Sequence, residues 1–380
     1  MSEEGAPAGR APARRLWQAR RNQSRLAAAG ATLLLAWSLY RGLAGPNRVL
    51  EVDGAVRHVA FSLDGRLFAV SLEGAVRLWD AATWSRRELA LPPAPEPTPR
   101  GGPLAFSPDG RRLAVAREAP DAGGASVFVW DLARQEWAWR APLGGAPVWL
   151  AFSPDGSRLA AAANAPAPPS RPTPGEIALF EAGAGGALDK LSGGDDAFSW
   201  VGWSADGRVL RYRKQVWSGG RYESLALAER PSQAGGAERT LHRERCPAPG
   251  TAASSPDGRL LAVADAGRES YLLVEPGGAA RSIDRELLAS PHPSPSFSPG
   301  AFSPDGRLYA APASFGAAGK DRRVRIWSAS SWRIVGEKPL RARGLVDPAI
   351  RSVAMSSSWL AAAYGDDLKT RIYLWNVARY

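Results

Sequence analysis

One short phrase recurs along this chain at nearly constant spacing. Its fullest form is Ala-Phe-Ser-Pro-Asp-Gly at residues 105–110, and five further copies keep the Ser-x-Asp-Gly core. Successive copies are 45, 46, 51, 51 and 48 residues apart, counted between the aspartates Asp64, Asp109, Asp155, Asp206, Asp257 and Asp305. Six copies at this period indicate one array of similar units, which also suits a length of 380 residues.

The chemistry of the phrase predicts two strands joined by a tight turn. Apolar residues such as Val59 and Phe61 precede the serine and read as a buried strand. In the turn, proline fixes φ, aspartate bonds its own backbone, and glycine accepts a positive φ. The Leu-Ala-Val-Ala run at 113–116 that follows is apolar throughout, so we expect a second strand that is buried on both faces.

A third strand follows most copies, and a short fourth strand follows that. The third strands are Val76–Asp80, Val127–Asp131, Ile177–Glu181, Val324–Ser328 and Ile372–Asn376. Four short strands in each unit of this length predict one blade of a β-propeller. A seventh, degenerate copy lies at 353–363 and lacks the Asp-Gly pair. With this copy included, we expect seven blades. Residues 47–52 form a lone strand, and we predict that they supply the outer strand of the last blade and close the ring.

The repeats resemble the WD40-repeat family, of a bacterial type, over residues 47–380. The resemblance rests on Trp79-Asp80 and Trp130-Asp131, the dipeptide that names the family. TolB-like propeller repeats share Ser-Pro-Asp-Gly, but the Leu-Trp-Asp strands favour WD40. No blade has the family's Gly-His dipeptide, which puts the buried Asp-His-Ser-Trp network in doubt. The resemblance implies an all-β, seven-bladed WD40-like β-propeller that acts as a non-catalytic protein-interaction scaffold.

The N-terminal segment predicts a membrane anchor. Residues 1–25 are rich in Ala, Pro, Gly and Arg and are expected to be disordered. Residues 26–40 carry no charge, and an N-terminal hydrophobic helix at 26–45 reaches about 20 residues if Arg41 extends to the headgroups. We expect a transmembrane signal anchor in the cell inner membrane, with a cytoplasmic N-terminus and an extracytoplasmic propeller. The alternatives are a cleaved signal peptide, which gives a secreted protein, and a helix of a soluble cytoplasmic scaffold.

The composition and the scattered cysteine and histidines do not indicate a catalytic or metal site. The net charge is +11, of which the first 25 residues contribute +4, and arginine far outnumbers the five lysines. This is the signature of GC-rich coding or of a polyanion-binding surface. Basic and aromatic residues do not interleave, so nucleic-acid binding is not indicated. The one cysteine, Cys246, and the histidines His58, His242 and His292 are scattered, so we expect no enzyme, metal or cofactor.

The predicted partner-binding residues lie where the chain enters each innermost strand. Aligning the repeats makes seven positions equivalent, namely His58, Pro103, Trp149, Trp200, Thr251, Pro299 and Ser352. Arg57 and Arg351 precede two of them. Because tryptophan and arginine dominate interface hot spots, Arg57, His58, Trp149, Trp200 and Arg351 are predicted to bind a protein partner. Alternatively, both tryptophans pack between blades.

The sequence therefore predicts a monomeric propeller, tethered to a membrane, that docks a protein. The other functional hypotheses are a propeller that binds or processes a small ligand or glycan, and a soluble scaffold. Blades four and five match the repeat least well.

Overall fold

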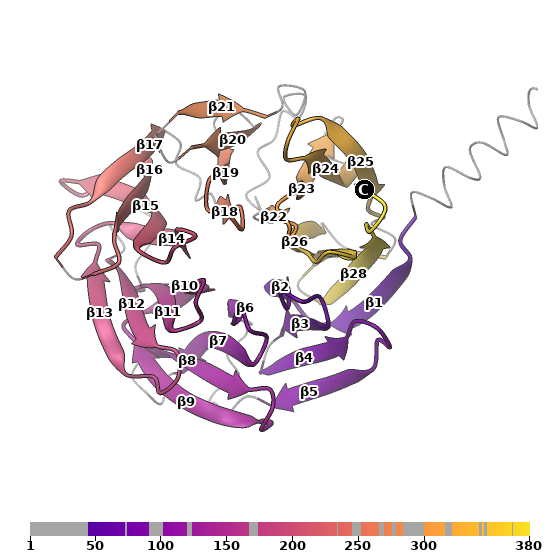
Figure 1. Ribbon diagram of the computed structural model, residues 1–380, viewed down its shortest axis with the longest axis horizontal. Helices are drawn as coiled ribbons and strands as arrows, with labels where there is room; N and C mark the ends of the chain where they lie inside the picture. Colours follow the sequence, from indigo (N-terminus) through magenta and orange to yellow (C-terminus); the bar gives the residue numbers. More distant parts are fainter. Residues whose placement is uncertain are drawn as a thin grey trace, which may run out of the picture. The chain divides into compact units, whose positions relative to one another are not determined.

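The chain folds into a ring of β-sheets. The computed structural model describes residues 45–72, 74–90, 102–119, 124–166, 174–233, 235–244, 252–265, 270–275, 279–283, 300–315, 321–341, 344–345, 348–366 and 368–380. The described strands form seven four-stranded antiparallel sheets, which stand around a common centre like the blades of a propeller (Figure 1). This confirms the seven-bladed architecture predicted from the repeat.

Six of the seven blades use four consecutive strands, with the first innermost. Blade one has β2 (His58–Phe61), β3 (Leu67–Ser71), β4 (Ala75–Asp80) and β5 (Arg86–Ala90). Blade two has β6 (Leu104–Phe106), β7 (Arg112–Ala119), β8 (Gly124–Asp131) and β9 (Glu136–Leu143). Blade three has β10 (Ala146–Phe152), β11 (Arg158–Asn164), β12 (Gly175–Glu181) and β13 (Ala187–Ser192). Blade four has β14 (Ala197–Trp203), β15 (Val209–Ser218), β16 (Arg221–Pro231) and β17 (Arg239–Glu244).

The remaining blades are completed in the same way. Blade five has β18 (Ala252–Ser254), β19 (Leu261–Asp265), β20 (Ser270–Val274) and β21 (Ala280–Ser282). Blade six has β22 (Ala301–Phe302), β23 (Leu308–Phe315), β24 (Asp321–Ser328) and β25 (Ile334–Pro339). Blade seven has β26 (Ala349–Met355), β27 (Trp359–Gly365) and β28 (Lys369–Asn376), and its outer strand is β1 (Arg48–Asp53).

The ring closes as the sequence predicted. β1 pairs antiparallel with β28, so the beginning and the end of the propeller share blade seven. The backbone N–H of Asn376 donates a 2.6 Å hydrogen bond to the Asn47 side chain at the start of this pairing. Unlike a blade made of one continuous segment, blade seven is complete only when both ends of the propeller meet, and β1 then covers the edge of β28.

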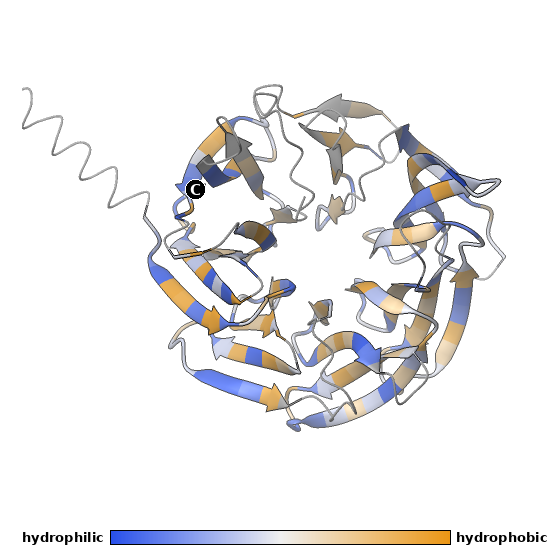
Figure 2. Ribbon diagram, turned by 180° about the vertical axis from the view of Figure 1, so that it is seen from behind, coloured by the Kyte–Doolittle hydropathy of each residue, from blue (hydrophilic) through white to orange (hydrophobic). Residues whose placement is uncertain are grey.

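The core lies between successive blades. One cluster joins blades seven and one, where Phe68 and Val70 of β3 pack with Ala361 and Leu374. Small residues let neighbouring sheets approach closely, and Ala160 to Ala163 of β11 are fully buried. Blue and orange segments alternate along outer strands such as β1, as expected for half-buried strands (Figure 2).

The repeated phrase forms the same turn in all six full copies, and blade three shows it well. The Ser153 hydroxyl donates a 2.5 Å hydrogen bond to Asp155 Oδ1, which also accepts the Ser157 N–H at 3.1 Å. Ser153 Oγ in turn accepts the N–H of Arg158 at 2.9 Å. Gly156 has φ 69°, which only glycine adopts without strain. The hydroxyl of Ser153, followed by that of Ser157, lowers the pKa of Asp155 to about 2.

The alternation of strand direction gives the ring two different faces. We call the turn face the one with the Ser-x-Asp-Gly turns between first and second strands, together with the turns between third and fourth strands. We call the loop face the opposite one, where the second strand passes to the third and each blade passes to the next. Every innermost strand therefore begins at the loop face, and we call the surface around these strand starts the mouth.

The predicted N-terminal segments stay predictions. The tail at 1–25 and all but the last residue of the helix at 26–45 lie outside the described residues. Residues 46–380 form one compact unit. In the part of the chain that the structure describes, no helix is long and apolar enough to span a membrane.

Candidate functional site

Three innermost strands carry a β-bulge at the mouth. The pairing register shifts between Pro147 and Trp149 in blade three, between Phe198 and Trp200 in blade four, and between Ile350 and Ser352 in blade seven. A bulge adds one residue to a strand and re-aims the side chains beside it. The extra residues are Val148, Ser199 and Arg351, so each bulge immediately precedes one of the positions that the repeat alignment made equivalent.

Arg57 lies directly before β2, and Arg351 lies on the neighbouring innermost strand, β26. β2 of blade one packs beside β26 of blade seven, and the Val59 N–H donates a 3.1 Å hydrogen bond to Ser352 Oγ across this junction. Arg57 precedes β2, at the same place in the repeat as Arg351. Arg57 is exposed and Arg351 is half-buried. The structure thus brings both predicted arginines to one side of the mouth.

His58 and Trp149 meet although blade two separates their blades. Their ring centroids are 5.1 Å apart and the rings are nearly perpendicular, at 88°. Between them lies the innermost strand of blade two, β6. Both residues keep some exposure, but His58 Nδ1 is buried and has no hydrogen-bond partner among the described residues. Burial lowers the pKa of His58 to about 4, against a weaker effect of its hydrogen bond to the Leu104 backbone. The imidazole is therefore neutral at physiological pH.

Trp149 and Trp200 occupy equivalent positions but have different surroundings. Trp200 is only 3% exposed and packs with Leu227, Leu241 and Val263 between blades four and five. Trp149 is half-buried, and one side of it rests against this same cluster. Of the five predicted residues, Arg57, His58, Trp149 and Arg351 keep some exposure at the mouth. Trp200 is buried in the cluster against which Trp149 packs.

The buried network that the sequence put in doubt is not formed by the described residues of blade one. Ser71 of β3 is 1% exposed, and its hydroxyl has no hydrogen-bond partner among them. His58 lies directly opposite Ser71 in the β2–β3 pairing, yet no bond joins the two side chains. The histidine thus faces the mouth and Trp149 rather than holding the blade together.

The described part of the chain holds no cluster of metal-ligating side chains. No group of three or more His, Cys, Asp or Glu there could hold a metal ion. Asp196 accepts the Trp217 N–H at 3.0 Å and pairs with Lys214, and Asp366 accepts the N–H groups of Leu368 and Lys369. His242 lies on the outer strand β17, and Cys246 and His292 fall outside the described residues.

The sequence did not predict a charged network in blade four. Lys214 Nζ lies 2.9 Å from Asp196 Oδ2 and 3.1 Å from Glu238 Oε1. Tyr212 donates a 2.6 Å hydrogen bond to the other Glu238 oxygen, and its pKa is raised by burial and by that bond. Burial acts to lower the pKa of Lys214, but its hydrogen bonds to the two carboxylates outweigh this effect and raise it. The network is mostly enclosed, so we interpret it as structural.

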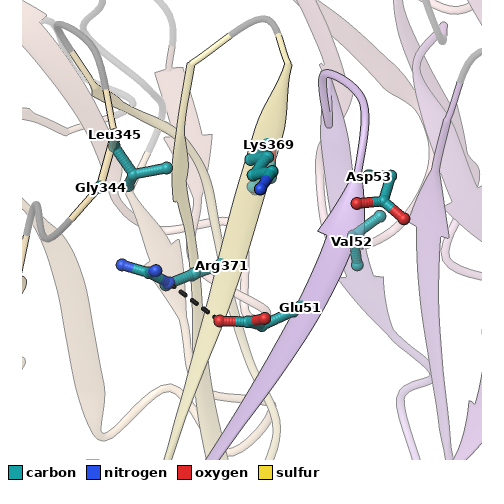
Figure 3. A pocket seen from close by; sticks show the side chains of 8 residues that line it. Glu51, Val52, Asp53, Gly344, Leu345, Lys369 and Arg371 are labelled. Atoms are coloured by element: carbon teal, nitrogen blue, oxygen red, sulfur yellow. Dashed lines mark hydrogen bonds and ion pairs between the residues drawn. The ribbon is translucent and has the colours of Figure 1, made fainter.

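A shallow cavity lies on the outer half of blade seven. It measures about 210 Å³ and is lined by Glu51 and Asp53 of β1 and by Lys369 and Arg371 of β28, with the loop at 344–345 on its far side (Figure 3). Arg371 Nε lies 3.2 Å from Glu51 Oε1. Asp53 is directly opposite Lys369 in the strand pairing. Both signs of charge alternate here, which is the usual pattern of a solvated pair of strands.

Comparisons with known proteins agree with this fold. Residues 46–80 match the family model described as "WD domain, G-beta repeat". A chain in the crystal structure of a mitotic checkpoint complex is similar, with a TM-score of 0.62 and 17% identity over 88% of this chain and 92% of that one. The β-propeller domain of Cps50 (Swd1) from Myceliophteria thermophila has a TM-score of 0.63 and 17% identity, over 88% of this chain and 99% of that domain.

No curated protein matches the chain. The matched segment covers the predicted Trp79-Asp80 dipeptide and the whole of β1 to β4. From the repeat and the seven four-stranded blades, we conclude that the chain is a seven-bladed β-propeller, and its residues 46–80 are similar to the WD40 repeat.

Proposed function

We propose that this propeller is a non-catalytic scaffold that docks a protein partner at the mouth of its loop face. The observation that carries the proposal is the meeting of Arg57, His58, Trp149 and Arg351 at this one mouth, although they come from three different blades. Arginine and tryptophan are the residue types that most often dominate binding energy at protein interfaces. WD40 propellers are typically interaction scaffolds, and one structural neighbour comes from a multiprotein complex.

The docking proposal is tested by capturing partners with the full chain from the cells that produce it. A photo-crosslinking amino acid replaces Val148, which lies beside Trp149 at the mouth, and a matched one replaces Leu63 on the turn face. We expect one protein to crosslink through position 148 and not through position 63. The partner is then identified by mass spectrometry. Crosslinking that is equal at both positions, or confined to position 63, would contradict the proposal.

We further propose that residues 26–45 tether the propeller to the inner membrane, with the propeller on the extracytoplasmic side. The support is the uncharged run at 26–40 and the arginines that precede it. Membrane fractionation of the full chain and of residues 46–380 tests the tether. The full chain should sediment with membranes and resist extraction by salt, and the propeller alone should not. If both are soluble, the tether is wrong and the scaffold acts free in solution.

A further inference from the structure

The chain enters the propeller at the turn face. β1 runs antiparallel to β28, and β28 ends at the turn face, so β1 begins there. At this end the Asn47 N–H donates a 2.8 Å hydrogen bond to the Leu374 carbonyl, and the N–H of Val377 donates to Ser358, in the turn between β26 and β27. Residues 26–45, the proposed tether, are therefore continuous with the turn-face end of blade seven and not with the mouth.

The connection between the proposed tether and β1 is short. From residue 45 to Arg48, where β1 begins, an extended chain covers at most about 11 Å. The polar headgroup layer is about 5–8 Å thick on each side of the hydrocarbon core of a bilayer. With residues 26–45 in the bilayer, the turn-face end of blade seven is thus held at or close to the lipid headgroups.

Exposed apolar side chains concentrate at the same face. In the part of the chain that the structure describes, seven large apolar side chains are well exposed, and six of them lie at the turn face. These six are Val49, Leu63, Leu188, Ile334, Val335 and Tyr380, whereas the seventh, Leu368, lies at the loop face between β27 and β28. Because such side chains gain free energy by leaving water, this unequal distribution indicates that the turn face contacts an apolar phase.

Four of the six belong to the neighbouring blades six and seven. Ile334 and Val335 begin β25, Val49 lies near the start of β1, and Tyr380 follows β28. β25, the C-terminus and β1 follow one another along the rim of the ring (Figure 1). Tyr380 packs against β25, where Lys338 Nζ lies 5.4 Å from its ring centroid. We call these four residues, each 40–44% exposed, the apolar corner.

The apolar corner also contains the polar residue types of a membrane interface. Arg48 and Arg333 are exposed and precede Val49 and Ile334 in the chain. A tyrosine ring lies favourably at the level of the headgroups, and an arginine can bury its aliphatic part while its charge stays among the phosphates. The corner therefore offers apolar side chains to the acyl boundary and cations to the headgroups above it.

We propose that the apolar corner rests in the headgroup layer of the membrane, so that the propeller is held with its turn face towards the bilayer and its mouth away from it. This inference rests on the proposed tether and adds a lipid surface as a second contact of the propeller. A tether alone leaves the propeller free to turn about its connection. The second contact fixes the orientation, and it leaves the mouth open to a protein partner.

Fluorescence quenching by lipid tests this orientation in the full chain. A fluorescent label is attached to Ala378→Cys on the turn face or to Leu368→Cys on the loop face, each in a Cys246→Ser background. The labelled chain is reconstituted in vesicles of equal parts phosphatidylethanolamine and phosphatidylglycerol that contain a quencher linked to the headgroup. β28 has eight residues and separates the two positions by about 26 Å, so we expect strong quenching at position 378 and little at position 368.

A double variant tests the part played by the apolar corner. Ile334→Ser/Val335→Ser should lower the quenching at position 378 by roughly half or more, because two apolar side chains no longer leave water. The matched control Leu188→Ser/Leu368→Ser removes two exposed apolar side chains outside the corner and should leave this quenching unchanged. Near-ultraviolet circular dichroism checks that both variants are folded.

The results that would overturn the inference are distinguishable from failure of the tether. If the chain floats with the vesicles but quenching is equal at both positions, stronger at position 368 or absent from both, the tether stands and the orientation is wrong. If quenching at position 378 does not respond to Ile334→Ser/Val335→Ser, the apolar corner is not a lipid contact. A chain that does not float with the vesicles would remove the tether and this inference together.

Discussion

Blades three and four have the same arrangement of strands, but the buried side chains of their second strands differ in size. The second strand of blade three, β11, contains four consecutive alanines, Ala160 to Ala163, all fully buried. The corresponding strand of blade four, β15, has Leu210, Arg211, Tyr212 and Arg213, which are also buried. Both strands follow the same Ser-x-Asp-Gly turn and pair antiparallel with their neighbours. The turn therefore determines the course of the chain, while the residues that follow it can be either the smallest or among the largest.

The difference shows what a long cation requires inside an interface between blades. Arg211 Nε lies 3.2 Å from Glu229, and its Nη1 donates to the Gly258 carbonyl of blade five. Arg230 of β16 pairs at 2.5 Å with Asp189, which belongs to blade three. Because a buried charge is costly unless it is paired, each cation brings a carboxylate or carbonyl with it. The alanines of blade three need no polar partner, but they are fully buried and leave no room for a larger side chain.

The largest expected effect is a difference in stability between variants of the two equivalent tryptophans, Trp149 in blade three and Trp200 in blade four. Trp200→Ala removes a side chain that is 3% exposed, and it should lower the free energy of unfolding by about 3–5 kcal/mol. Trp149→Ala, in blade three, should cost clearly less, because that ring is half-buried. Urea denaturation followed by tryptophan fluorescence and far-ultraviolet circular dichroism measures both. Equal losses would mean that the two rings are equally enclosed.

The charged interface should be nearly as sensitive to the loss of one partner. Lys214→Met leaves Asp196 and Glu238 facing one another without their shared cation, and it should cost about 3 kcal/mol in urea denaturation. Lys190→Met is the matched control, since Lys190 also pairs with a glutamate but its side chain is 62% exposed, and it should cost less than about 1 kcal/mol. Adding Asp196→Asn and Glu238→Gln to Lys214→Met should restore part of the loss. A further loss in the triple variant would show that the carboxylates serve some other partner.

The alanine strand should instead be sensitive to added volume. Ala161→Leu introduces three carbon atoms where blades two and three already touch, and overpacking of this kind costs about 1–3 kcal/mol. Ala184→Leu is the same change at an exposed position of the same blade, in the turn between β12 and β13, and it should leave the urea midpoint unchanged. If Ala161→Leu is tolerated, the interface between blades two and three is looser than the full burial of its alanines implies.

The features that depend on short stretches of sequence could be predicted from the sequence alone. The Ser-x-Asp-Gly turns, the blade number and the closing strand at 47–52 all follow from short phrases and from the order of strands, and the structure confirms them. The exposure of Trp149 and Trp200 could not be predicted, because equivalent positions differ only in what adjacent blades present. Trp149 contacts His58 across blade two, whereas Leu227 and Val263 cover Trp200.

The charged network of blade four was missed for a related reason. Its sequence signal is visible in hindsight, since Arg211, Arg213 and Lys214 stand where blade three has alanines. The carboxylates that pair with Lys214 come from the connection before β14 and from the residue before β17. No fixed spacing links those positions to β15, so only the folded sheet brings them together.

The smallest expected effect follows from loss of the aspartate in the Ser-x-Asp-Gly turn. It should be similar in blades three and four, because both contain this turn. The folded pKa of Asp155 is about 2, below its ordinary value of 3.8, so the aspartate stabilises the fold above pH 4. This contribution is lost as the pH falls from about 4 towards 2, because the carboxylate is then protonated in the folded protein as well.

Asp155→Asn should therefore lower the free energy of unfolding at pH 7 by about 0.5–1.5 kcal/mol, the worth of the lost hydrogen bonds. The difference between variant and wild type should shrink as urea titrations are repeated at lower pH. Asp206→Asn should shift the midpoint in the same direction, because Asp206 accepts the equivalent hydrogen bond from Ser204, at 2.6 Å. Asp195→Asn, an exposed aspartate outside the phrase, is the control and should have no effect at any pH. A pH-independent loss in Asp155→Asn would mean that the turn depends on the shape of the side chain and not on its charge.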